Sequence, residues 1–176
     1  VARTSYFKGD FVWAKAQTDV LRKSTTQLIA NDALKMTLMI HDNTLEDSLQ
    51  TALKKYARAD FLALQNKDTQ AIEVLTEILT SHKGEKIEDE ALLKQAELFE
   101  KTEQYKKAEA NYLKIIAVYK DEILADDAYF NLANLYEHQL QDPQKAKQYY
   151  EQIVFDFADS IYFIQSRKKY RMLRGR

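Results

Sequence analysis

The chain has 176 residues, 45% hydrophobic and 30% charged, with a formal net charge of -1; this composition is that of a folded globular protein and argues against disorder. Three glycines and one proline provide few of the turns that strands need, and the lack of cysteine excludes disulfides and thiolate zinc sites. No apolar run reaches the roughly 18 residues of a membrane span. We expect an all-α fold. Because the sequence begins at Val1, we also expect it to be a piece of a longer protein.

Residues 1–54 are predicted to form irregular N-terminal helical repeats. The stretch YFKGDFVWAKAQTDVL has the pattern of a first-helix end, a turn at Gly9 and Asp10, and a second helix in which Ala16 is the small residue at the helix crossing. Trp13 is predicted to pack in the core of this helix pair.

An additional helix is predicted between this helix pair and the next repeat. The candidates are residues 30–41 and 45–65, with the loop HDNT between them, and the opening IANDAL has the Asn and Asp of a helix start.

Residues 55–160 are predicted to form three repeated units. The segment QAELFEKTEQYKKAEANYLKII recurs as LANLYEHQLQDPQKAKQYYEQI, and a third copy reads ARADFLALQNKDTQAIEVLTEIL. Their second-helix alanines, Ala71, Ala108 and Ala146, are 37 and 38 residues apart, a period that indicates stacked supersecondary units. Apolar residues three and four apart predict two antiparallel amphipathic helices in each unit, with small residues where they cross. In the third unit, Asp142 is the expected cap of a helix that begins at Pro143.

Residues 161–176 are predicted to form a basic C-terminal capping helix. From Ile161 onward there are six basic residues and no acidic ones, which leaves 20 basic and 27 acidic residues before it. An inward stripe is expected from Phe163, Ser166, Tyr170 and Leu173, whereas Arg171 occupies the place of Ala96 and Ala133 and should prevent a further helix from packing closely.

The sequence shows no catalytic, cofactor-binding or metal-binding pattern. His41, His82 and His138 lie far apart, without the close spacing of a helical metal site, and isolated glycines cannot form a phosphate-binding loop. The acidic clusters at 88–90 and 126–127 stand at helix openings, where they offset the helix dipole. We therefore expect no enzyme, no cofactor and no metal site.

The repeated helix pairs, with small crossing residues followed by aromatic ones, resemble the tetratricopeptide repeat. The resemblance implies an all-α, right-handed superhelical solenoid of antiparallel helix pairs, acting as a non-enzymatic protein–protein interaction scaffold. It also implies a concave groove, lined by first helices, that binds a peptide or helix of a partner protein. The residues expected in this groove are Tyr56, Asp60, Glu90, Lys94, Glu97, Asp127, Phe130, Asn131, Asn134 and Glu137. Because carboxylates dominate this set, a basic or apolar ligand is expected.

The openings such as ILADDAYF and the ending IVFDFADSIYFIQSRKKY resemble more specifically a bacterial subgroup of envelope repeat proteins. This resemblance implies the periplasm or envelope, although the residues are also compatible with the cytoplasm. A basic patch is expected from Arg167, Lys168, Arg171 and Arg174. Three interpretations of this patch stay open: a solvated helix side, a phosphate contact to nucleic acid, or a contact to a protein or an anionic surface.

Overall fold

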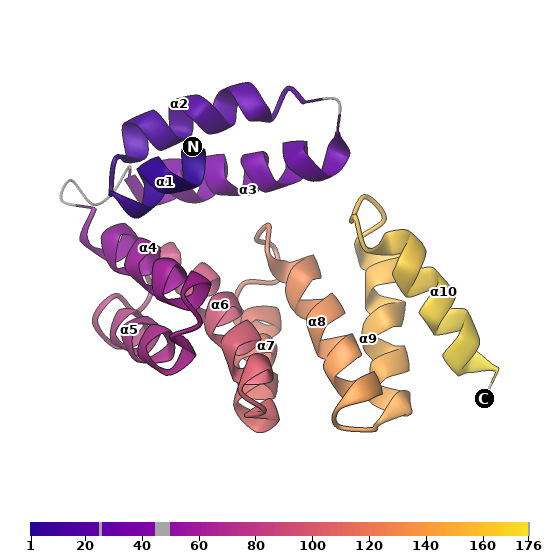
Figure 1. Ribbon diagram of the computed structural model, residues 1–176. Helices are drawn as coiled ribbons and strands as arrows, with labels where there is room; N and C mark the ends of the chain where they lie inside the picture. The colour runs from indigo at the N-terminus through magenta and orange to yellow at the C-terminus, as the bar shows by residue number, and fades with distance from the viewer. Residues whose placement is uncertain (25, 45–49, 176) are drawn as a thin grey trace. The chain divides into compact units, whose positions relative to one another are not determined.

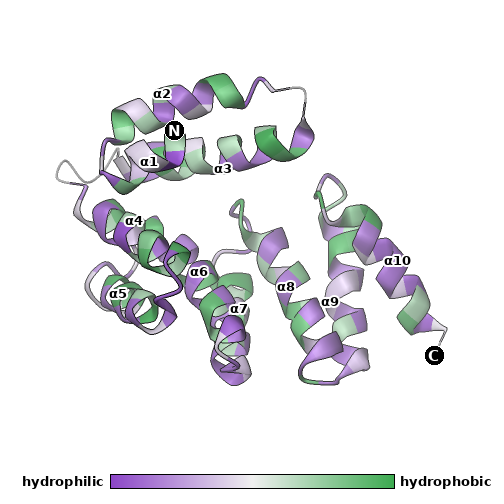
Figure 2. Ribbon diagram, viewed as in Figure 1, coloured by the Kyte–Doolittle hydropathy of each residue, from purple (hydrophilic) through white to green (hydrophobic). Residues whose placement is uncertain are grey.

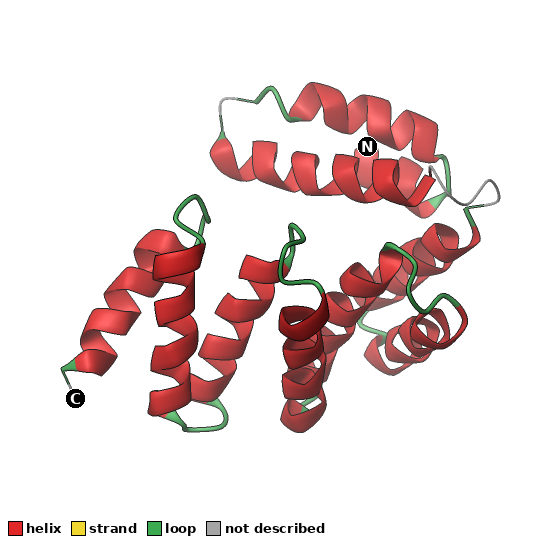
Figure 3. Ribbon diagram, turned by 180° about the vertical axis from the view of Figure 1, so that it is seen from behind, coloured by secondary structure: helices red, strands yellow, loops and turns green. Residues whose placement is uncertain are grey.

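The computed structural model describes residues 1–24, 26–44 and 50–175. Within these ranges the chain forms ten α-helices joined by turns, and no strand is present (Figures 1 and 3). The predicted all-α fold is therefore confirmed. None of the described helices combines the length and the hydropathy needed to cross a bilayer. The chain divides into two compact units, Val1–Ala91 and Leu92–Arg176.

The first unit contains five complete helices and the first turn of a sixth. Helix α2 packs on α1 and α3, and α4 packs on α1, α3 and α5. The bounds are α1 Ala2–Phe7, α2 Phe11–Leu21, α3 Gln27–Thr44, α4 Thr51–Leu64, α5 Asp68–Ser81 and α6 Ile87–Lys101.

The second unit contains the rest of α6 and four further helices. Its core is made of apolar side chains that face between the helices, and Figure 2 shows hydrophobic and hydrophilic residues alternating along α8 and α9. Helices α8, α9 and α10 lie side by side, and α7 packs on α8. Asn111 joins α7 to α6 by donating to Gln95 Oε1 at 2.9 Å. The bounds are α7 Tyr105–Val118, α8 Ala125–His138, α9 Pro143–Asp156 and α10 Phe163–Arg174.

Four helix pairs share one turn geometry. The turns contain a residue with left-handed backbone, and the following N–H donates back to a carbonyl near the end of the first helix, as from Gln104 to Phe99 at 2.7 Å. The left-handed residues are Gly9, Asn66, Glu103 and Gln141, with φ of 76°, 58°, 60° and 52°. The last three are 37 and 38 residues apart, so the backbone independently confirms the repeat period read from the alanines. Of the four, Gly9 adopts this conformation without the steric penalty of a Cβ atom.

A completely buried alanine follows each of these turns by five residues. These alanines are Ala14, Ala71, Ala108 and Ala146, and each is 0% exposed. The prediction for Ala16 is therefore wrong, because the turn at Gly9 sets the register and turns Ala16 toward solvent. The prediction that Trp13 packs in the core is wrong for the same reason, since its side chain is 57% exposed.

Enlarging Ala14 to leucine should therefore destabilise the chain, while the same change at Ala16 should not. Extra methylenes in a packed helix crossing cost about 1 to 3 kcal/mol, and we expect Ala14→Leu to fall in this range. Thermal melting of both variants measures the difference. Equal loss of stability in the two variants would contradict the register given by the Gly9 turn.

Helix α3 is inserted between the first helix pair and the next one. It covers the predicted helix at 30–41, but it begins at Gln27, so IANDAL lies inside the helix and does not mark its start. HDNT forms the last turn of α3 rather than a loop. The side chains of Asn43 and Thr44 accommodate this by donating to carbonyls one turn earlier. The predicted helix start at 45 lies outside the described residues.

The openings of α8 and α9 differ in how they are capped. As predicted, Asp142 Oδ1 accepts from the N–H of Lys145 at 3.0 Å, and Pro143 occupies the first turn of α9. At α8 the residue before the helix is Leu124, and Asp126 and Asp127 lie within the first turn. Negative charge is thus placed near the positive end of the α8 dipole, as expected, but Asp126 and Asp127 also accept hydrogen bonds from Ser160 and Tyr162, which precede α10.

Candidate functional site

The first unit contains three of the residues expected to contact a partner. Tyr56 and Asp60 lie on α4 and Glu90 lies in the first turn of α6, and all three are half-buried. Burial, reinforced by the neighbouring Asp89 carboxylate, raises the pKa of Glu90 to about 10. Glu90 is therefore uncharged at neutral pH, and it adds no negative charge to this surface.

The other seven residues lie in the second unit and differ in exposure. Glu97 on α6 is exposed, whereas Lys94 on α6 and Asn131, Asn134 and Glu137 on α8 are half-buried. Two are buried: Asp127 is 6% exposed and Phe130 is 9% exposed.

Helix α10 and the residue before it engage three of these α8 residues. The Tyr162 ring stacks on Phe130 with centroids 4.2 Å apart, and its hydroxyl donates to Asp127 Oδ1 at 2.6 Å. Lys169 Nζ contacts both oxygens of Glu137, at 2.8 and 2.9 Å. Residues expected to contact a partner thus support the C-terminal helix.

A tyrosine–glutamate pair recurs in the two helix pairs of the second unit. Tyr112 donates to Glu100 Oε1 at 2.5 Å, and Tyr150 donates to Glu137 Oε2 at 2.8 Å. Both tyrosines are 0% exposed. Burial raises the pKa of each phenol, so both remain protonated donors.

The two glutamates have opposite pKa shifts. Burial raises the pKa of Glu100, and the hydrogen bond from Tyr112 only partly offsets this. Partial burial also acts to raise the pKa of Glu137, but hydrogen bonds from Lys169 and Tyr150 outweigh it and hold the pKa below its usual value. By the spacing of 37 and 38, the residue equivalent to Lys169 on the preceding first helix is Asn131. Deeper burial of Glu100, together with a lysine beside Glu137 where the preceding repeat has an asparagine, accounts for the difference.

Replacing each glutamate by glutamine should give opposite results at neutral pH. Glu137→Gln should lower the free energy of unfolding by roughly 1 to 3 kcal/mol, the range for hydrogen bonds to charged groups. Glu100→Gln should leave it unchanged or raise it, because the folded state already disfavours the charged form. Urea unfolding of both variants at about pH 7 gives the comparison.

The pH dependence provides the control for this pair. Glu137 has a lowered folded-state pKa, so it stabilises the fold above the unfolded value of roughly 4.3, and this contribution is lost as the pH falls through the folded-state pKa. Glu100 has a raised pKa, so its contribution is present at low pH and lost as the pH rises. Parallel pH profiles for the two variants would contradict the assignment.

The four residues of the predicted basic patch, Arg167, Lys168, Arg171 and Arg174, are all exposed on α10. The inward stripe is confirmed at Ser166 and Leu173, which are 0% and 7% exposed, while Phe163 and Tyr170 are half-buried. Ser166 matches Ala91 and Ala128, both also 0% exposed, at spacings of 38 and 37. Helix α10 therefore occupies the place of a further first helix.

Sequence reasoning missed Tyr162 and Lys169 as partners of α8. Lys169 was counted within the basic run, and its role could have been found from its repeat spacing to Lys94 and Asn131. No comparable signal identifies Tyr162, because it lies before the helix, where spacing is set by a loop.

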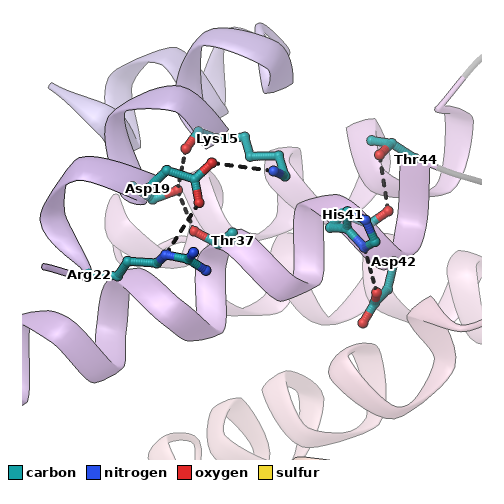
Figure 4. Close-up of polar contacts among 8 residues, drawn as sticks. Lys15, Asp19, Arg22, Thr37, His41, Asp42 and Thr44 are labelled. Atoms are coloured by element: carbon teal, nitrogen blue, oxygen red, sulfur yellow. Dashed lines mark hydrogen bonds and ion pairs between the residues drawn. The ribbon is translucent and has the colours of Figure 1, made fainter.

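Polar contacts on α2 and α3 are local and structural (Figure 4). Lys15 and Arg22 both contact the Asp19 carboxylate, at 3.3 and 3.6 Å, and Thr37 donates to Thr18 across the helix pair at 2.7 Å. His41 lies beside Asp42 at 3.0 Å. Among the described residues, no group of three or more potential ligands is arranged to hold a metal ion.

Comparison with known proteins identifies two repeats in the second half of the chain. Residues 90–121 match one family model described as a tetratricopeptide repeat, and residues 126–154 match another with the same description. The first match spans most of α6 and all of α7, and the second spans nearly all of α8 and most of α9. A search of curated proteins gives no match. The matched helix pairs are the second and third units predicted from the alanine spacing.

Proposed function

Because this chain belongs to the tetratricopeptide-repeat family, we propose that it is a scaffold that binds a peptide or helix of a partner protein along its first helices. Tetratricopeptide repeats are protein–protein interaction modules and are typically not catalytic, so the coarse function follows from the family. The contact residues and the chemistry of the ligand are the proposal.

The surface of α6 supports this proposal best. Glu97 follows the buried Ala96 and is exposed, whereas the equivalent residue after Ala133 is Asn134. Asn134 accepts from Tyr150 at 2.9 Å and donates to the Phe130 carbonyl at 3.0 Å. The last matched repeat therefore uses this position within its own fold, whereas in the preceding repeat the same position is exposed.

We place the main ligand contacts of the second unit at Lys94, Glu97 and Asn131, and those of the first unit, taken by itself, at Tyr56 and Asp60. Asp127, Phe130 and Glu137 serve chiefly to hold α10, and the neutral Glu90 contributes polarity without charge. An exposed carboxylate at Glu97 favours a basic ligand, with apolar residues contacting the neighbouring helices. The envelope resemblance makes a bacterial periplasmic or envelope assembly the proposed setting.

Charge reversal at Glu97 should weaken binding of such a ligand. Extended peptides rich in Lys, Arg and Leu can be selected on the immobilised chain and their affinities measured by fluorescence anisotropy. Glu97→Lys should reduce affinity by about fivefold to tenfold. The variant loses a carboxylate that attracts the basic ligand and gains a cation that repels it. Stability should change little, since Glu97 is exposed.

The matched control is Glu73→Lys, which makes the same charge change at an exposed position on the second helix α5. It should leave the affinity nearly unchanged. Selection of acidic peptides, or equal weakening by the two variants, would place the binding surface elsewhere.

A further inference from the structure

The outer side of α10 carries an exposed surface in which basic and apolar residues alternate. Ile164 is 74% exposed and Met172 is 52% exposed, and the four residues of the basic patch lie around them. At about 100° per residue, all six fall within roughly 160° of the helix circumference, opposite Ser166 and Leu173. We call these six residues, Ile164, Arg167, Lys168, Arg171, Met172 and Arg174, the free face of α10.

In α6 and α8 the side equivalent to part of this face is covered by a second helix. Ala96 and Ala133, each 0% exposed, lie on first helices that are followed by α7 and α9, and Arg171 lies at the equivalent position on α10, 38 residues after Ala133. No second helix follows α10 in the described residues. The face has the geometry of a helix-packing surface, but it carries the cation Arg171 where the earlier first helices carry a small alanine.

The charge on this face is not neutralised by any of the residues that the structure describes. Lys169, on the packed side of α10, is paired with Glu137, whereas in the described part of the structure none of the four basic residues of the free face forms an ion pair. No acidic residue occurs from Ile161 to the end of the sequence. A ligand for this face must therefore supply negative charge.

We propose that the free face of α10 binds an acidic amphipathic helix of a partner protein. The partner helix takes the place that α7 and α9 take on the earlier first helices, with carboxylates paired to the arginines and apolar side chains on Ile164 and Met172. Arginine guanidinium groups bind carboxylates through two parallel hydrogen bonds. Because Arg171 is longer than the alanine at the equivalent position, the partner helix lies slightly farther from α10 than α7 and α9 lie from their first helices.

Two features favour a protein helix over other anions. Exposed Ile164 and Met172 have no counterpart on a phosphate backbone, which is bound through charge and hydrogen bonds alone. A bilayer surface selects helices with segregated apolar and basic sides, whereas here the cation of Lys168 lies between the two apolar residues, and Arg171 flanks Ile164 on the other side. Alternating basic and apolar positions match a helix with alternating acidic and apolar ones.

The test uses the 176-residue chain and a labelled helical peptide of about four turns, with leucines on one side flanked by glutamates. A peptide of the same composition with scrambled order, a single-stranded RNA of similar charge, and anionic phosphatidylglycerol vesicles are the comparison probes. Fluorescence anisotropy gives the affinities for the first three, and vesicle sedimentation gives that for the last.

Variants separate the charge from the apolar contribution. Arg167→Glu with Arg171→Glu should weaken binding of the helical peptide by about tenfold or more, and Ile164→Ser with Met172→Ser by about fivefold. Lys83→Glu with Lys120→Glu makes the same net charge change at exposed positions elsewhere and should change affinity less than about twofold. Circular dichroism verifies that every variant remains folded.

Tighter binding of the amphipathic peptide than of the scrambled one, with the expected loss in both free-face variants, supports the proposal. Equal affinity for the scrambled peptide, a preference for RNA or vesicles, an unaffected Ile164 and Met172 variant, or no binding of the peptide overturns it. The proposed groove takes a basic ligand and this face an acidic one, so failure here leaves the Glu97 test unaffected.

Discussion

Deleting Ser160 to Arg176 lowers the free energy of unfolding of the second unit by several kcal/mol and makes the shortened chain associate. The deletion removes the buried Leu173 and Ser166, the Tyr162 ring on Phe130 and the ion pair from Lys169 to Glu137. Each large apolar side chain contributes about 1.5 to 3 kcal/mol on burial. Urea unfolding measures the stability change, and light scattering measures association.

The association has a specific structural origin. Without Tyr162, the Phe130 ring is uncovered next to Tyr150, whose ring it contacts edge-on at 6.2 Å, and the side of α9 that packs on α10 becomes exposed. Repeat arrays that end on an apolar surface aggregate unless a polar element covers it.

The matched control changes charge and keeps the helix. Arg167→Gln with Arg174→Gln should melt within about 1 °C of the parent chain, because both residues are exposed and exposed charges contribute little to stability. A shortened chain that stays monomeric and melts like the parent would show that α10 is an independent arm and not a cap.

The repeat period was the part of the fold most readily predicted from sequence. Ala71, Ala108 and Ala146 could be found because only a small side chain fits where two helices approach closely, and three such positions at regular spacing are unlike ordinary alanine placement. The left-handed turn residues obey the same period, although a glutamate at 103 and a glutamine at 141 give no turn signal.

The first unit was harder because its period is broken. Ala14 and Ala71 are 57 residues apart, and the inserted α3 leaves no regular spacing from which to choose between Ala14 and Ala16. The Gly9 turn could have decided between them, since five residues separate each left-handed residue from its buried alanine. Trp13 lies one residue before Ala14. Because Ala14 faces the helix crossing, the Trp13 side chain faces solvent.

The sequence predicted which first-helix positions the candidate contact residues occupy. It did not predict which other residues each of them contacts in the fold. Glu100 and Glu137 have the same place in the repeat, yet their pKa values shift in opposite directions, because Glu100 is more deeply buried and Lys169 binds Glu137. Such differences depend on the element that packs next. In the last repeat that element is α10, which was predicted as a cap without its contacts to Asp127, Phe130 and Glu137.

Replacing Ala108 or Ala146 with leucine should destabilise the second unit by about 1 to 3 kcal/mol each. Both residues are 0% exposed, and each lies where a second helix crosses its first helix. Three additional carbon atoms at this crossing must push α7 from α6, or α9 from α8, because packed interiors have no space of that size. The hydrogen bonds from Tyr112 and Tyr150 to the first helices should weaken as the helices separate. Urea unfolding and tyrosine fluorescence report the two effects.

Ala110→Leu is the matched control, because Ala110 lies two residues from Ala108 on the same helix and is exposed. Its leucine side chain should extend into solvent and change stability by less than about 0.5 kcal/mol. Losses that are equal for Ala108→Leu and Ala110→Leu would mean that helix propensity or solubility, and not crowding at the crossing, determines the result. A loss confined to Ala108 and Ala146 shows that the alanine period encodes the distance between paired helices, which is the property that makes the chain a repeat protein.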